Sequence, residues 1–426
     1  MRSKKLCSAV KPIFVSFVTL LLASIAVPAQ TQATKFKVLH TFKGSDGGSP
    51  MGVLVRDAAG NIYGTTIGGG TGKCSKMGCG TAFKLNKSGQ QVWLYSFKGG
   101  NGLNPDAGLL RDAAGNLFGT TVYGGDTNCA PPEGCGTVFE LDKTGKKGTV
   151  LHKFTGTPDG WFPEALLVED PAGNLYGTTY LGGSSSLGAV FKIDKTGKET
   201  ILHSFAGPPD GGGDGAFSYQ GVIRDSAGNL YGVTDAGGAY GAGVVYERNA
   251  RGKETLLYSF TGFSDGSGPN SVLLMDADGN LYGTTKGGGN GECGGTGCGV
   301  VFELSPHSDG SWTESTLYVF CSLASCTDGE EPLAGPLVRD SAGNLYGTTY
   351  FGGDIRLCNG SCGVVFKLDN AGKETVLHTF TGGADGAFPY AGLTIDGQGN
   401  LYGTTQGGGA TCYTSYTCGV VFKITP

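Results

Sequence analysis

The sequence predicts an all-β protein, a seven-bladed β-propeller with four antiparallel strands in each blade. A phrase of the form Gly-Asn-Leu-Tyr-Gly-Thr-Thr occurs seven times at spacings of 51 to 64 residues, a period typical of a propeller, a solenoid or an array. No stretch has helical periodicity, and short β-branched and aromatic runs bounded by Gly, Asn and Asp surround each copy. The two ends of the chain also complement each other. The Asn residues of the seven copies are Asn61, Asn116, Asn174, Asn229, Asn280, Asn344 and Asn400.

The first 29 residues are expected to be a secretory signal peptide. Four basic residues precede an apolar run at 12–26, and small residues follow at 27–29 as in a cleavage site. This run is too short to predict a transmembrane span, and no other run is long enough. We therefore expect a short linker at 30–35, a single propeller at 36–426 and a location outside the cell or in the periplasm.

Composition supports the same fold and excludes one class of partner. Gly makes up 80 of 426 residues, at fixed offsets within the repeats, where it supplies the positive φ of tight turns. Loss of the signal peptide changes the net charge from −5 to −9. Nucleic-acid binding needs a basic surface, so we expect no nucleic-acid partner. We also expect a monomer without a cofactor or a bound metal.

One complete repeat illustrates the expected blade. Strands are predicted at 335–340, 345–349, 363–368 and 374–380, with tight turns between the first and second and between the third and fourth. The mature chain begins with a fourth strand at 37–42 and ends with a third strand at 419–424. Seven complete blades result only when the first of these strands joins the last blade. Such closure removes exposed sheet edges, whereas an open solenoid, the alternative, gives no reason for complementary ends.

Twelve cysteines of the mature chain form six local pairs, which we interpret as disulfides because the protein is expected to be exported. Zinc is the alternative, but the spacing and the supply of His fit it poorly. Five pairs lie in loops of 13 or 14 residues, whereas the two repeats without Cys have loops of 8. The expected pairs are Cys74 with Cys79, Cys129 with Cys135, Cys293 with Cys298, Cys321 with Cys326, Cys358 with Cys362, and Cys412 with Cys418.

The repeat resembles a known family. Its Gly-Asn-Leu-Tyr-Gly-Thr-Thr core, its Gly-Thr-Val-Phe-Lys segment and its Phe-x-Gly…Asp-Gly turn are similar to the GloVer-type tandem repeat of bacterial exported proteins, over residues 36–426. The resemblance implies export and a repeat fold, and it brings no catalytic residues. Members often carry a C-terminal sorting anchor, which we do not expect here.

Several recurring residues are interpreted as scaffold. His40, His152, His203 and His378 occupy a strand position that holds Tyr in the other repeats, and Arg56 and its equivalents also recur. Blade-to-blade loops share an Asp-Gly turn, in which the Asp caps its own turn or, as the alternative, binds calcium. Asp276-Ala-Asp278-Gly-Asn280 resembles a calcium loop but lacks the downstream Glu.

The residues that break the repeat are the candidates for function. The loops with the Cys pairs and the blade-to-blade loops emerge on one face, called here the loop face, where function is expected. Aromatic residues suit sugar rings or protein partners, but they can also pack between adjacent blades. The candidate binding residues are Trp161, Phe162, Tyr180, Phe217, Tyr219 and Tyr240, with Phe388 and Tyr390 as a second Phe-x-Tyr pair.

We expect an exported, non-catalytic propeller that binds a glycan or a protein through the loop face. The first alternative is an enzyme that acts on polysaccharide, as a lyase or a hydrolase, which would need a pair of acid and base groups in one pocket. Glu330, Glu331, Asp126 and Glu133 are loop carboxylates that are available for it. The second alternative is a purely structural envelope protein without a distinct pocket.

Overall fold

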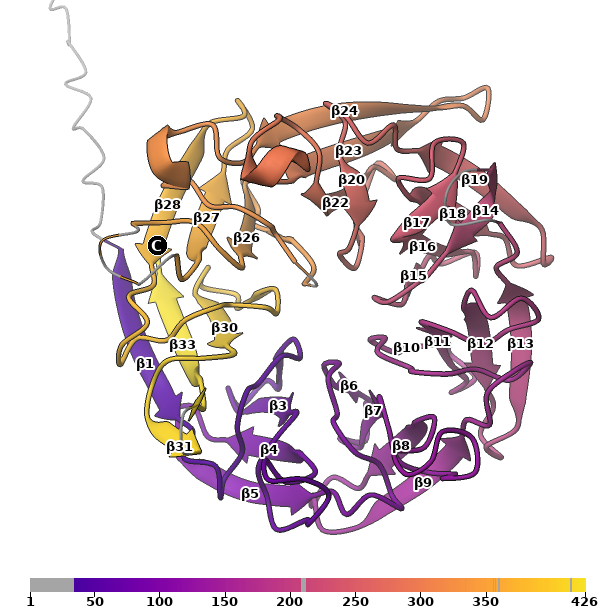
Figure 1. Ribbon diagram of the computed structural model, residues 1–426, viewed down its shortest axis with the longest axis vertical. Coiled ribbons are helices and arrows are strands. Elements are labelled where there is room, and N and C mark those ends of the chain that lie inside the picture. The colour runs from indigo at the N-terminus through magenta and orange to yellow at the C-terminus, as the bar shows by residue number, and fades with distance from the viewer. Residues whose placement is uncertain are drawn as a thin grey trace, which may run out of the picture. The chain divides into compact units, whose positions relative to one another are not determined.

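A computed structural model describes residues 34–426 except 208–211, 334, 355, 357, 359–360 and 414–415. The expected signal peptide and the start of the linker lie outside this part of the chain. Residues 34–426 form a seven-bladed propeller of four-stranded antiparallel sheets, placed radially around a central axis (Figure 1). Within the described residues, no helix is both long enough and apolar enough to cross a bilayer.

The first six blades follow the chain, and each runs from its innermost to its outermost strand. Blade 1 is β2 (Val55–Arg56), β3 (Ile62–Thr66), β4 (Thr81–Leu85) and β5 (Gln91–Ser96); blade 2 is β6 (Leu110–Arg111), β7 (Leu117–Thr121), β8 (Thr137–Leu141) and β9 (Gly148–Lys153). Blade 3 is β10 (Val168–Glu169), β11 (Leu175–Thr179), β12 (Ala189–Ile193) and β13 (Glu199–Ser204); blade 4 is β15 (Val222–Arg224), β16 (Leu230–Thr234), β18 (Val244–Arg248) and β19 (Glu254–Ser259). Blade 5 is β21 (Leu274–Met275), β22 (Leu281–Gly287), β23 (Val300–Pro306) and β24 (Trp312–Val319); blade 6 is β25 (Val338–Arg339), β26 (Leu345–Thr349), β27 (Val364–Leu368) and β28 (Glu374–Thr379).

Blade 7 combines the two ends of the described chain. It contains β29 (Thr394–Ile395), β30 (Leu401–Thr405), β33 (Val420–Thr425) and β1 (Lys35–Thr41), in that order. β1 pairs antiparallel with β33, with Phe36 opposite Ile424 and Val38 opposite Phe422. The outermost strand of the last blade therefore comes from the start of the propeller.

Short additional strands and 3₁₀ turns lie on the loop face. β20 (Ser267–Pro269) pairs with β22, while β14 (Gly212–Ala216) pairs with β17 (Ala236–Gly238) and β31 (Thr411–Tyr413) with β32 (Tyr416–Thr417). Two 3₁₀ turns, η1 (Cys293–Gly295) and η2 (Ala324–Cys326), lie in loops that carry Cys pairs.

The inner strands are shorter than expected. Residues 335–340 were predicted as a strand, but only Val338–Arg339 pair. The strand ends there because Asp340 already belongs to the turn, where its backbone N–H donates to the carbonyl of Asn344.

The repeated phrase has a clear structural reason, here for blade 6. The Asp340 carboxylate accepts hydrogen bonds from the backbone N–H and the side-chain amide of Asn344, at 2.9 and 2.7 Å, and from the hydroxyl of Tyr346 at 2.8 Å. A Cβ on Gly347 would lie 2.6 Å from Cζ of Phe366, so only glycine fits between the packed strands. Thr348 Oγ1 donates to the carbonyl of Ala391 in the next blade, at 3.0 Å.

The core lies between neighbouring blades. At each boundary a buried Phe that follows the outermost strand packs edge-on against an aromatic ring on the third strand of the next blade, with ring centres 5.0 to 5.3 Å apart. The seven pairs are Phe42–Phe83, Phe97–Phe139, Phe154–Phe191, Phe205–Tyr246, Phe260–Phe302, Phe320–Phe366 and Phe380–Phe422.

Candidate ligand-binding site

Six disulfides stabilise the loop face, with the pairing expected from the sequence. As expected, five of these disulfides lie within the loops between the second and third strands, and the structure adds that the second cysteine of each is buried in the core between blades. The reason is its position directly before the glycine that precedes the third strand, where the loop enters the packed end of the sheet. The buried cysteines are Cys79, Cys135, Cys298, Cys362 and Cys418.

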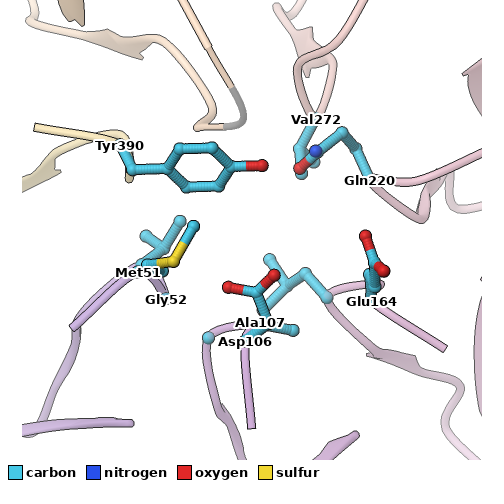
Figure 2. Close-up of a pocket in the computed structure, with 11 residues that line it drawn as sticks. Met51, Gly52, Asp106, Ala107, Glu164, Gln220, Val272 and Tyr390 are labelled. Carbon is cyan, nitrogen blue, oxygen red and sulfur yellow. The ribbon is translucent and has the colours of Figure 1, made fainter. Parts of the chain in front are cut away.

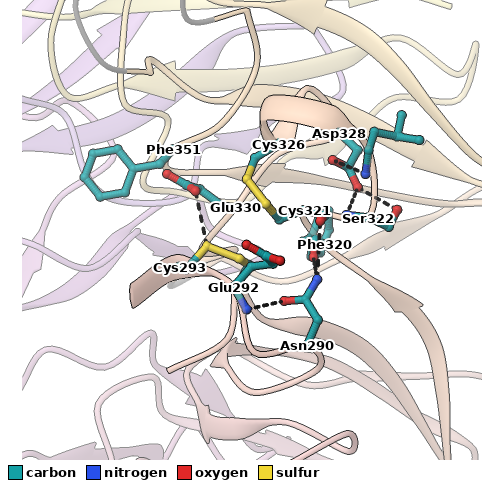
Figure 3. The surroundings of a disulfide bond; sticks show 12 residues. Asn290, Glu292, Cys293, Phe320, Cys321, Ser322, Cys326, Asp328, Glu330 and Phe351 are labelled. Atoms are coloured by element: carbon teal, nitrogen blue, oxygen red, sulfur yellow. Dashed lines mark hydrogen bonds between the residues drawn. A yellow bond between two sulfur atoms is a disulfide. The ribbon is translucent and has the colours of Figure 1, made fainter. Parts of the chain in front are cut away.

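Two of these disulfides lie next to each other. Figure 3 shows Cys293, the partner of Cys298, close to the Cys321–Cys326 disulfide of the neighbouring loop and to the Glu330 carboxylate. Five disulfides thus connect the tip of a loop to a cysteine buried in the core, and the sixth, Cys321–Cys326, closes a short segment of one blade-to-blade loop.

At the outer edge of the blades, the recurring His or Tyr of the outermost strand contacts the Asp of the following Asp-Gly turn, an arrangement called here the outer-edge bracket. His378 Nε2 lies 3.1 Å from Asp385, whose carboxylate also accepts the backbone N–H of Thr381. Where the repeat has Tyr, the hydroxyl takes the same place, as Tyr258 does on Asp265 at 2.9 Å. The turn-capping interpretation of the Asp-Gly loops is therefore confirmed.

The turn that resembles a calcium loop is also structural. Asp276 accepts hydrogen bonds from Asn280 and from the Tyr282 hydroxyl. Arg339 of the next blade donates to the same carboxylate at 2.9 Å and lies 5.4 Å from the Tyr282 ring centre. The recurring Arg position thus joins adjacent blades, as the scaffold interpretation expected.

The repeats differ from one another in the residues that lie at the axis of the propeller. In each blade-to-blade loop, the residue directly before the loop proline, or before Ser218 in blade 4, has φ between 51° and 63°, as in Phe217 and Phe388. The second residue after it, called here the axial position, holds a different kind of side chain in most blades. Figure 2 shows four of these side chains around one central space. The seven axial positions are Met51, Asp106, Glu164, Tyr219, Asn270, Leu333 and Tyr390.

A small cavity lies at this axis (Figure 2). It is lined by Met51, Gly52, Val53, Asp106, Ala107, Gly108, Glu164, Leu166, Gln220, Val272 and Tyr390. Among the described residues, every blade except blade 6 contributes to it. Its volume of about 20 Å³ is enough for little more than one water molecule.

Two carboxyl groups, one from blade 2 and one from blade 3, share this cavity, and their surroundings disfavour the ionised form of both. Burial raises the pKa of Asp106 to about 6. Burial and the charge of Asp106 raise the pKa of Glu164 to about 8. Asp106 Oδ1 is inaccessible to bulk water and has no hydrogen-bond partner among the described residues.

Neutral polar groups complete the cavity. Gln220 donates its side-chain N–H to Asn270 Oδ1 at 2.8 Å, so its own carbonyl oxygen remains available to the cavity. Figure 2 shows the Gln220 amide and the Tyr390 hydroxyl facing each other across the space, with the carboxylates of Asp106 and Glu164 beside them. Burial, followed by the charges of Asp106 and Glu164, raises the pKa of Tyr390.

Five of the six candidate aromatic residues form two clusters. Tyr180 stacks on Tyr219 with ring centres 4.3 Å apart and also contacts Phe217 at 5.1 Å. Trp161 contacts Phe162 at 4.8 Å. The first cluster joins blades 3 and 4, as the packing alternative expected, yet all five residues remain half-buried rather than buried.

The sixth candidate lies apart from these clusters. Tyr240 is 63% exposed, and no ring contact within the described part of the chain includes it. The second Phe-x-Tyr pair forms a matching cluster in blades 6 and 7, where Tyr350 lies 5.3 Å from Phe388 and 6.1 Å from Tyr390. Tyr350 also donates its hydroxyl to Gln406 at 2.7 Å. Aromatic clusters therefore reach the axial positions of two different blades.

The loop carboxylates considered from the sequence do not line the axial cavity. Glu330 and Glu331 lie elsewhere on the loop face, where burial raises the pKa of each, and Glu133 is exposed. The axial carboxylates Asp106 and Glu164 were not predicted. Six blade-to-blade loops have a proline before the axial position, and blade 4 has Ser218 in place of the proline. A comparison of the residues that follow would have found the two carboxylates, because this position varies between apolar, acidic and aromatic residues.

Comparison with known proteins gives one family and several distant structures. The sequence model of the Gloeobacter/Verrucomicrobia repeat matches residues 27–216 and 209–422. No curated protein matches the chain.

Solved structures show the same fold at low identity. A polysaccharide lyase of family PL25, an ulvan lyase bound to -[GlcA(1-4)Rha3S]-, is 12% identical with a TM-score of 0.50, over 79% of this chain and 86% of the other. A candidate 6-phosphogluconolactonase from Bacteroides fragilis is 17% identical with a TM-score of 0.50, over 82% and 89%. The extracellular domain of a candidate hybrid two-component system from B. thetaiotaomicron is 14% identical with a TM-score of 0.53, over 92% of this chain and 42% of the other.

Proposed function

We propose the function of this chain from its own site, because the chain belongs to the Gloeobacter/Verrucomicrobia repeat family, whose description gives a repeat and no activity. The proposed function is that of an exported propeller that binds carbohydrate on the loop face. The observation that carries the proposal is the placement of Tyr219 and Tyr390 at axial positions: Tyr390 lines the cavity with Asp106, Glu164 and Gln220, and the charge of Glu164 contributes to the raised pKa of Tyr219.

This combination suits a sugar. A pyranose ring has an apolar face that stacks on aromatic rings and hydroxyl groups that bind carboxylates and amides. The Tyr180–Tyr219 stack is held by packing, so little conformational entropy is lost when a ligand binds to it. Trp161 and Phe162 extend the aromatic surface within blade 3. A flat protein partner would use these rings without the axial carboxyl groups.

The size of the cavity favours binding over cleavage. Two carboxyl groups in one pocket are the usual requirement for hydrolysis of a glycosidic bond. However, a cavity of about 20 Å³ beside Asp106 and Glu164 admits a water-sized species and not a sugar ring. A bound sugar would therefore lie above these groups, on the tyrosines.

Export is part of the proposal for two reasons. Six disulfides are typical of proteins that mature in an oxidising compartment. The basic and apolar N-terminal segment at 1–29 has the composition of a signal peptide.

The test is binding of the mature protein to a glycan array, with Tyr219→Ala and Trp161→Ala as variants. Phe263→Ala is the matched control, because the Phe263 side chain is 78% exposed. The backbone carbonyl of Phe263 closes a turn by accepting the backbone N–H of Gly266. We expect binding that is reduced at least about tenfold in Tyr219→Ala and unchanged in Phe263→Ala.

Three results would oppose the proposal. Absence of binding to any glycan would favour the structural-protein alternative or a protein partner. Binding that Tyr219→Ala and Trp161→Ala leave intact would locate the glycan elsewhere on the propeller. Release of new reducing ends or of unsaturated products from a bound glycan would show catalysis and replace the binding function by the enzyme alternative.

A further inference from the structure

We propose that the axial cavity is a binding site for a single calcium ion, with Asp106 and Glu164 as its charged ligands. The inference does not depend on the carbohydrate proposal, and it differs from the sequence-based expectation of no metal.

The groups that line the cavity are those that calcium prefers. Calcium takes six to eight oxygen ligands from carboxylates, amide and backbone carbonyls and water. The cavity offers the carboxylates of Asp106 and Glu164, the amide oxygen of Gln220 and the hydroxyl of Tyr390 (Figure 2). Its lining, within the described part of the chain, includes no Lys, Arg or His side chain, so no protein cation competes for these oxygens.

Asp106 gives an independent indication of a ligand at this site. Buried carboxylates are normally paired with a cation or hydrogen-bonded, because an isolated buried charge is costly. The Oδ1 atom of Asp106 is buried and has no hydrogen-bond partner among the described residues. Asp106 is half-buried and lines the cavity, and its carboxylate points towards the central space (Figure 2).

Elsewhere in the described part of the propeller, Glu199 Oε1 and Glu374 Oε1 at the outer edge also lack a hydrogen-bond partner, whereas the carboxylates of the outer turns have several. Asp340 and Asp385, for example, accept several hydrogen bonds each. The repeat therefore satisfies these acidic residues where they are structural. Asp106 and Glu164 occur at a position that the repeat does not specify, and Asp106 has no such donor on Oδ1 within the described residues.

Size and ligand type decide between cations. A volume of about 20 Å³ accommodates one ion, so most of its ligands must be oxygen atoms of the residues that line the cavity. Zinc prefers His and Cys ligands, which are absent from the lining that the structure describes, and magnesium demands a nearly ideal octahedron with several retained waters. Ligands that come from separate blades form an irregular set of oxygens, which calcium tolerates.

The experiment is calorimetric titration of the disulfide-bonded mature protein with calcium chloride after treatment with a chelator and in the absence of glycan. Asp106→Asn and Glu164→Gln are the test variants. Glu133→Gln is the matched control, because it removes an exposed carboxylate from the same face. The melting temperature of each variant is measured with and without calcium.

We expect one calcium ion per chain, with a dissociation constant no weaker than about 1 mM, the range of extracellular calcium modules. Either test variant should weaken binding at least about tenfold and abolish the calcium-induced rise in melting temperature, whereas Glu133→Gln should bind like the wild type. If Asp106→Asn fails to fold, as judged by circular dichroism, Glu164→Gln decides.

The proposal is overturned by wild-type protein that binds no calcium at millimolar concentration. It is also overturned by folded test variants that retain wild-type affinity, since the ion would then lie elsewhere. Equal binding of magnesium and calcium would contradict the assignment to calcium. None of these results depends on whether a glycan binds.

Discussion

His203 Nε2 lies 2.8 Å from a carboxylate oxygen of Asp214, within the same outer-edge bracket that every blade repeats. The same nitrogen is 2.7 Å from Glu254, which begins the outermost strand of the next blade. One imidazole therefore connects two neighbouring blades through two carboxylates. In the other repeats Tyr or His makes the contact within the bracket, so this contact belongs to the scaffold and not to the site.

The charge of His203 should make the stability of the protein depend on pH. Burial disfavours the charged ring, but the hydrogen bonds to Asp214 and Glu254 outweigh burial and raise the pKa of His203 to about 9. The pKa in the unfolded chain is about 6.5. The stabilisation is therefore fully present below about pH 6.5 and is lost as the pH rises towards 9, by roughly 1–3 kcal/mol.

His203→Tyr should remove most of this loss, because Tyr takes this position in other repeats and an ordinary Tyr titrates only near pH 10. The free energy of unfolding in urea, measured between about pH 6 and pH 9, provides the comparison. His307→Gln is the control, since His307 is exposed and its side chain bonds to Thr313 within its own hairpin. An unaltered pH profile in His203→Tyr would contradict the assignment.

Replacement of the glycine in the repeated phrase should destabilise the blade. In Gly347→Ala the new methyl group would lie 2.6 Å from Phe366 Cζ and 2.9 Å from Leu337 Cδ2, both in the core. Overpacking of this kind costs about 1–3 kcal/mol. Chemical denaturation should show a lower midpoint with an unchanged slope.

Gly397→Ala is the matched control for this substitution. A Cβ on Gly397 meets nothing within 4 Å, and its backbone is outside the left-handed region. Its stability should stay within about 0.5 kcal/mol of the wild type. Equal effects of the two substitutions would show that chain flexibility, and not packing, explains the glycine of the phrase.

The sequence predicted the parts of the molecule that repetition defines, and it missed the part that depends on position around the axis. Asp340, Asn344 and Tyr346 recur together, so their shared turn could be inferred from the phrase alone. Asp106 and Glu164 are 58 positions apart and resemble ordinary loop acids. Only ring closure brings the axial positions of all blades to one place. The aromatic residues were singled out as breaks in the repeat, but their distribution over separate clusters required the structure.

The cysteines show the same division between local and distant information. The spacing of Cys129 and Cys135 was enough to predict their pairing, because a local pair needs no knowledge of the fold. Burial of Cys135 against blade 3, and of Cys362 against blade 7, depends on how neighbouring blades pack. Spacing along the chain holds no information about that packing.

Reduction of the disulfides should loosen the loop face and leave the blades folded. A disulfide that closes a loop of 4 to 6 residues stabilises by about 2 kcal/mol at most. The buried cysteines, such as Cys79 and Cys418, still fill their places as thiols. We therefore expect a lower melting temperature after full reduction, with an unchanged far-ultraviolet spectrum at room temperature. A melting temperature that does not respond, with reduction verified by mass spectrometry, would contradict a stabilising role.

Removal of β1 should open the propeller. Its pairing partner β33 would become an exposed edge strand, which invites association with other chains. The deletion also removes Phe36, which stacks on His378 of blade 6 with ring centres 3.7 Å apart and contacts Phe422 at 5.6 Å. Loss of a fully buried Phe ring costs roughly 3–5 kcal/mol, so loss of the half-buried Phe36 alone should cost less than this.

Deletion of residues 35–41 should therefore give a less stable protein that associates, as measured by thermal unfolding and by light scattering after gel filtration. A synthetic peptide of residues 35–41 should restore the monomer, and a scrambled peptide should not, because only the native order presents Phe36 to His378 and Val38 to Phe422. A truncated chain with wild-type stability would mean that the other three strands close blade 7 without β1. The ring would then be held by the buried aromatic pairs between blades and not by the joining of its two ends.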